Sequence, residues 1–138
     1  MPAYIFIKKE LQKITDEKEL RDLLQNLLFK MDFERTAITH GPNEQGKDLV
    51  CSYSNKFNKR DWIGFVVKIG SIIGGTKKTD SSVINIENQV KLSFSQPYFD
   101  TFEKQNVYIN KVNVVTNGTI SQPAKEQISR NFTEKANI

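Results

Sequence analysis

The chain has 138 residues, of which 38% are hydrophobic, a length that suits one domain with a single core and is too short for two. Twenty basic residues against sixteen acidic ones give a net charge of +4, which permits a polyanionic partner without requiring one. A single cysteine excludes an internal disulfide, and the sequence contains neither a signal peptide nor a run of about 20 apolar residues. We therefore expect a cytoplasmic domain, 1–138, that does not enter the membrane. Its polar ending leaves open that it is the first part of a larger protein.

The first strong pattern predicts a helix from Asp16 to Met31. Apolar residues recur there at helical spacing and form one stripe, which we expect to be buried. Asp16 is suited to cap the first turn, because its carboxylate can accept a hydrogen bond from a main-chain N–H. The stripe consists of Leu20, Leu23, Leu24, Leu27, Leu28 and Met31.

Three strands are predicted next, with turns between them. Residues 35–40 alternate polar and apolar side chains, and 41–46 have the composition of a turn. Residues 48–53 form the second predicted strand. The third, at 63–69, is apolar on both faces, as expected at the centre of a covered sheet. Three consecutive strands of this kind favour a meander.

The second half of the chain alternates between helix and strand. A glycine- and lysine-rich loop at 71–80 precedes a helix that ends before Pro97. A strand follows at 107–116, and Ser121 is suited to cap a last helix through Phe132. We predict the α/β class, with a mixed sheet of four strands, or five if 4–7 adds one, flanked by helices in the order α-β-β-β-α-β-α. The last two core strands should be parallel, joined by a right-handed crossover.

Two charged residues at the ends of the central strands are candidates for a site. Asp48 opens the second strand, and Lys68 ends the third. If these strands pair, the carboxylate and the ammonium lie close, and at about 4 Å an ion pair is worth about 4 kcal/mol at an effective dielectric of about 20. An isolated pair of this kind is usually only structural. The order of the surrounding elements favours a functional site.

That order, with an acid on the second strand and a lysine on the third, resembles the restriction endonuclease-like superfamily known by its PD-(D/E)xK signature. The glycine-containing loop at 41–48 is similar to the Mrr-type branch, and Val114 to Ser121 is similar to its fourth strand and the start of its last helix. The resemblance extends from about Glu19 to Arg130. It implies a metal-dependent endonuclease that hydrolyses DNA in bacterial defence and uses Mg²⁺ or Mn²⁺.

The resemblance also implies roles for individual residues. Asp48 would hold the cation together with the carbonyl of Val67, and Lys68 would stabilise the attacking water or the charge on the phosphate. Val66 occupies the position of a further acid or amide ligand and has no donor atom. Glu34 is our first choice to replace that ligand. Other acids and amides that could do so, or that could simply be solvated, are Glu44, Glu87 and Gln89.

The alternative is a domain of the same fold that has lost catalysis and binds nucleic acid or another protein. Basic residues in two loops could contact phosphates or be merely solvated. They are Lys77 and Lys78 in one loop, and Lys56, Lys59 and Arg60 in the other. A homodimer and further domains of the same polypeptide remain open as partners.

Other residues give no stronger motif. One histidine, His40, and one cysteine, Cys51, cannot form a zinc site of the usual composition, and nothing near them resembles a cysteine-protease signature. Trp62, Tyr98 and Phe99 are predicted to be core or interface aromatics.

Overall fold

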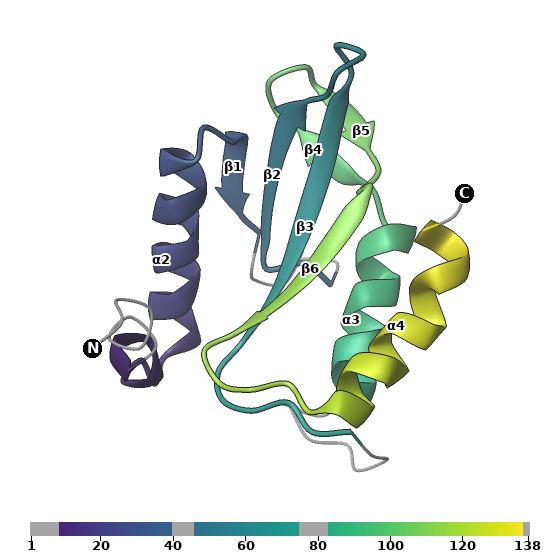
Figure 1. The fold of residues 1–138 in the computed structure, drawn as a ribbon. Helices are drawn as coiled ribbons and strands as arrows, with labels where there is room; N and C mark the ends of the chain where they lie inside the picture. Colours follow the sequence, from purple (N-terminus) through teal and green to yellow (C-terminus); the bar gives the residue numbers. More distant parts are fainter. Residues whose placement is uncertain (1–8, 40–45, 75–82, 137–138) are drawn as a thin grey trace.

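A computed structural model describes residues 9–39, 46–74 and 83–136, with the main chain alone from 130 onward. The chain forms a mixed α/β fold (Figure 1). Its elements, in chain order, are α2 (Glu17–Lys30), β1 (Glu34–Ile38), β2 (Leu49–Ser54), β3 (Arg60–Lys68), α3 (Val83–Ser95), β4 (Tyr98–Asp100), β5 (Gln105–Val107), β6 (Lys111–Thr116) and α4 (Gln122–Ala136).

The main sheet has four strands in the order β1-β2-β3-β6. The pairs β1–β2 and β2–β3 are antiparallel, and β6 lies parallel to β3. The mixed sheet, the meander and the parallel last pair confirm the coarse prediction. The short strand expected at 4–7 lies outside the described residues.

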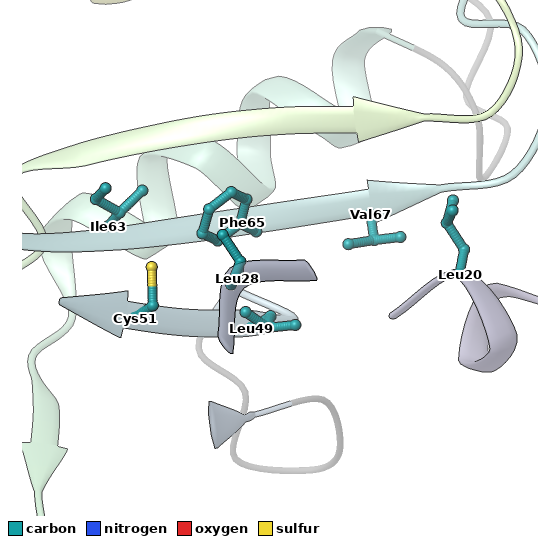
Figure 2. Close-up of a cluster of buried hydrophobic side chains, with 7 residues drawn as sticks. All are labelled: Leu20, Leu28, Leu49, Cys51, Ile63, Phe65 and Val67. Carbon is teal, nitrogen blue, oxygen red and sulfur yellow. The ribbon is translucent and has the colours of Figure 1, made fainter. Parts of the chain in front are cut away.

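Helices cover both faces of the sheet (Figure 1). On one face, Leu20 and Leu28 of α2 pack against alternate residues of β2 and β3, including Cys51 and Phe65 (Figure 2). On the other face, α3 and α4 lie side by side over a second cluster that contains Val66. Because successive strand residues point to opposite faces, the nine-residue β3 supplies both clusters.

The leucine stripe of α2 is only partly buried, which corrects the expectation that all of it joins the core. Asp16 caps the helix as predicted, with Oδ1 accepting from the Lys18 N–H at 3.0 Å. Leu20 and Leu28 are each 5% exposed, but Leu23 and Leu27 are 44% and 51% exposed. The six apolar positions span more of the helix circumference than a single sheet face can cover.

A two-stranded hairpin, β4–β5, was not predicted. It pairs Tyr98 with Val107 and Asp100 with Gln105, and it is separate from the main sheet. A third apolar cluster joins the hairpin to the sheet, with Trp62 and Ile109 at its centre and Tyr98 packed against the Trp62 ring. The predicted strand at 107–116 is therefore two strands, since 108–110 separates β5 from β6.

Candidate functional site

A glycine held tightly against α3 positions the start of β2. Gly46 has a φ of +90°, and a Cβ added there would lie 2.3 Å from the main-chain oxygen of Gln89. The chain thus touches α3 just before Asp48, a close approach that only glycine permits. The following Lys47 is 1% exposed, and its Nζ donates to the Gln96 carbonyl oxygen at 3.4 Å. Burial lowers the pKa of Lys47.

The structure brings Asp48 close to the end of β3. Its main-chain N–H donates to the Phe65 carbonyl at 2.8 Å, and its carboxylate Oδ2 accepts from the Val67 N–H at 2.8 Å. Lys68 is the next residue along β3. Asp48 is 2% exposed, so its carboxylate is fixed in a buried position beside the peptide group that joins Val66 to Val67.

The expected ion pair between Asp48 and Lys68 is not formed. The ion pairs found in the described part of the chain join other groups, and none includes Lys68. The Lys68 side chain is partly exposed and follows the same face of the sheet as Val66.

Val66 is a core residue. It is fully buried and packs with Val83 and Ile86 of α3. Within residues 9–39, 46–74 and 83–136, no group of three or more His, Cys, Asp or Glu side chains could hold a metal ion. In this part of the chain, Asp48 is therefore not joined by two further ligating side chains of these types.

An oxygen of α3 is a further candidate for the site. Gln89 Oε1 is buried and has no hydrogen-bond partner, and the main chain of Gln89 touches Gly46. Side chains of a helix tilt toward its N-terminus. The N-terminal Val83 of α3 packs with Val66 and Ile72, at the Lys68 end of β3, so the Gln89 side chain tilts toward that end. An orphaned oxygen there suits a water molecule or a hydrated cation.

Glu34 is not brought to Asp48. It pairs with Ser52, four residues beyond Asp48 along the sheet, or about 13 Å away at the usual rise of a strand. Its Oε2 lies 3.4 Å from Nη2 of Arg60. Glu34 therefore lies too far from Asp48 to share a cation with it. Glu44 lies outside the described residues.

The basic residues predicted to contact phosphate fall into two groups. Lys77 and Lys78 lie outside the described residues. Lys56, Lys59 and Arg60 belong to the turn between β2 and β3 and the start of β3, at the opposite end of that strand from Lys68. Eight residue steps along β3 separate Arg60 from Lys68, about 26 Å.

A polar hollow of about 520 Å³ lies beside this turn, and the sequence did not predict it. Its walls come from the start of β3, from Arg35 of β1 and from the β4–β5 hairpin. The Arg35 guanidinium bonds Asp100 at 2.7 Å and Glu103 at 3.3 Å, and it covers the Phe102 ring at 5.1 Å. In the sequence, the basic residues of the β2–β3 turn indicated this region. The hollow itself could not be expected, because the β4–β5 hairpin that completes it was not predicted.

Comparison of the chain with family models, with curated proteins and with solved structures gives no significant match. A search of the helices in the described ranges finds none with the length and apolar character of a membrane span.

Proposed function

We propose that this chain is a restriction endonuclease-like domain that hydrolyses phosphodiester bonds of DNA with the help of a divalent cation. The observation that carries the proposal is the Asp48 carboxylate, which accepts from the Val67 N–H at 2.8 Å. Val67 precedes Lys68, which has no carboxylate partner among the described residues. The order of helices and strands and the mixed sheet support it, since the resemblance implies the same arrangement.

The donor groups suit a cation whose other ligands are mostly oxygens of water and substrate. Magnesium is commonly bound through one or two carboxylates, with water and phosphate oxygens completing its shell. Asp48 would supply the carboxylate, and the unpartnered Gln89 oxygen is a candidate to hold one of the waters. Such a cation lowers the pKa of bound water and offsets charge on the phosphate.

The residues of the chain then have distinct tasks. Asp48 presents a fixed negative charge, because the Val67 N–H orients its carboxylate. The Lys68 ammonium lies at the partly exposed end of β3, where it can stabilise negative charge on a bound phosphate. The close packing of Gly46 on α3 keeps Asp48 in register with this end of the sheet.

Incubation of the purified chain with supercoiled plasmid and Mg²⁺ or Mn²⁺ tests the proposal. Asp48→Asn keeps the shape of the side chain and an oxygen for the Val67 N–H, but it removes the charge. We expect Asp48→Asn and Lys68→Ala each to reduce nicking by at least about 100-fold, as is usual for loss of an electrostatic group in an active site. Lys125→Ala, on the exposed face of α4, is the matched control and should nick normally.

A second candidate function, nucleic-acid binding without cleavage, is favoured by the complete burial of Val66 at the position where the resemblance implies a ligand. On this alternative the plasmid stays supercoiled with either metal, while the protein still retards it in a salt-dependent way. Nicking that survives Asp48→Asn would instead point to a contaminating nuclease and contradict the first proposal.

A further inference from the structure

The end of the sheet far from Asp48 carries unpaired lysines around the polar hollow. Lys59 lines the hollow, Lys56 belongs to the same β2–β3 turn, and Lys104 lies in the β4–β5 turn between Glu103 and Gln105, which also line the hollow. None of the three lysines has a carboxylate within ion-pair distance in the described structure. Three such charges in the turns beside one concavity suit a polyanion.

The carboxylates near the hollow are occupied by internal partners. Asp100 is 2% exposed, with Oδ2 on Arg35 and Oδ1 accepting from the Phe102 N–H. Glu103 accepts from Arg35 and from the Gln105 amide. Asp61 accepts from the Asn55 amide, and a hydrogen bond to Asp61 raises the pKa of Tyr53. These acids have partners within the protein, whereas the three lysines have no such carboxylate and can bind a ligand.

Phe57 and Tyr108 are among the aromatic rings exposed at the same end of the sheet. Phe57 of the β2–β3 turn is 84% exposed, and Tyr108, which lines the hollow, is 61% exposed. The turn that carries Phe57 is ordered, because Asn55 Oδ1 accepts from the main-chain N–H groups of Phe57 and Lys59 at 2.8 and 3.1 Å. An apolar ring held in solvent by a well-bonded turn adds little to the core and offers a flat face to a ligand.

We propose that these three lysines, the Phe57 and Tyr108 rings and the hollow beside them, here named the hairpin-end surface, bind single-stranded nucleic acid. Unpaired bases stack on exposed rings while lysines follow the phosphates, a combination that a duplex cannot use because its bases are already stacked and paired. The hollow has the volume of a small-ligand site, and its side-chain amides, Asn58, Gln105 and Asn110, can hydrogen-bond a base edge. The inference does not rest on the cleavage proposal, because it needs neither Asp48 nor a metal ion.

Fluorescence anisotropy with a labelled oligothymidylate of about 12 nucleotides, without metal at about 50 mM salt, tests the inference. We expect Phe57→Ala and Tyr108→Ala each to weaken binding about tenfold, and Lys59→Ala to lower the slope of log affinity against log salt by about 0.7. Phe29→Ala, an equally exposed ring on α2, is the matched control and should bind as the parent does. An abasic strand with the same phosphates should bind weakly and lose its sensitivity to both ring substitutions.

Three results would overturn the inference. They are absence of binding to the oligothymidylate, equal loss with Phe29→Ala, and equally tight binding of polyglutamate, which shares the charge but has no bases. Asp48→Asn separates this inference from the proposed function, since it should reduce nicking by at least about 100-fold and leave unchanged the binding of an oligothymidylate of about four nucleotides, which is too short to reach Asp48. All substituted side chains of the hairpin-end surface are exposed, so circular dichroism and thermal melting should show an unaltered fold.

Discussion

At the scale of single residues, Gly46 is the position at which the described structure most strictly requires a glycine. Its φ of +90° lies in the region that glycine favours, and an added Cβ would meet main-chain atoms of Gln89 and Ser93 at 2.3 and 2.8 Å. Main-chain atoms of a helix cannot move aside as a flexible side chain can. The position of Asp48, two residues later, depends on this contact.

We therefore predict that Gly46→Ala destabilises the domain by more than about 3 kcal/mol, the range in which severe core clashes fall. Gly70→Ala is the matched control, because Gly70 has a φ of +83° but its added Cβ would meet nothing within 4 Å. That substitution should lower the free energy of unfolding only by the strain of placing alanine at a positive φ, about 1 to 2 kcal/mol. Urea denaturation of both variants measures the difference, and equal losses would show that the contact with α3 is unimportant.

Cys51 makes a second prediction at this scale. It is fully buried between β2, β3 and α2 (Figure 2), and burial raises the pKa of its thiol from 9.0 to about 11. Because the pKa is higher in the folded state, its contribution to stability is complete below pH 9.0 and is lost as the pH rises through about 11. The loss should approach about 3 kcal/mol.

Stability measured against pH for the parent and for Cys51→Ala isolates this effect. The alanine variant lacks the thiol, so the difference in stability between the two proteins should shrink between pH 9 and 11. At pH 8 the native thiol should not react with a disulfide reagent until the protein unfolds. A rapid reaction of the native protein would show that Cys51 is accessible.

At the scale of elements, one buried ion pair fastens the β4–β5 hairpin to β1. Arg35 has a φ of +54° at the irregularity of β1, and its side chain reaches Asp100 at 2.7 Å. The Asp100 side chain is only 3% exposed, so removal of Arg35 would leave a buried charge without a partner. This pair also forms one wall of the polar hollow.

We predict that Asp100→Ala costs about 3 kcal/mol, since breaking a buried pair strands the remaining charge. Glu103→Ala, which removes the more exposed partner of the same arginine, should cost less than about 1 kcal/mol. A double-mutant cycle of Arg35→Ala and Asp100→Ala should give a coupling energy of at least about 1 kcal/mol. Additive losses would mean that the hairpin is held by the Trp62 cluster alone.

The long elements could be predicted from the sequence, and the short ones could not. Helix α2 and the strands β2 and β3 have strong hydrophobic periodicity and begin within about three residues of their predicted positions. The strands β4 and β5 have three residues each, too few for a recognisable alternation. Their pairing depends on packing against Trp62, a contact between distant parts of the chain.

The same distinction applies to the candidate sites. Asp48 and Lys68 could be selected because Asp48 begins one predicted strand and Lys68 ends the next, and antiparallel pairing of these strands brings their main chains together. The apolar run at 63–69 already indicated a buried Val66, but no pattern revealed that Glu34 bonds Arg60, since that contact depends on how the strands pack. The hairpin-end surface joins the β2–β3 turn to Tyr108, a combination visible only in three dimensions.

At the scale of the whole molecule, β3 carries a proposed site at each end. Lys68 lies beside Asp48 at one end, and Arg60 lies at the hairpin-end surface, about 26 Å away. At the spacing of one B-form strand, about 3.4 Å per nucleotide, some eight nucleotides cover this distance, and an extended strand needs fewer. A short oligonucleotide therefore cannot contact both ends.

We predict that strand length decides which residues matter for affinity. An oligothymidylate of about four nucleotides should bind the hairpin-end surface alone, with affinity lowered by Tyr108→Ala and unaffected by Lys68→Ala. A strand of about 16 nucleotides should respond to both substitutions, and Lys68→Ala should lower its salt slope by about 0.7. Anisotropy titrations over a series of lengths measure the change. Equal sensitivity of the shortest strand to Lys68→Ala would contradict two separate contact regions, because no short strand reaches from Tyr108 to the far end of β3.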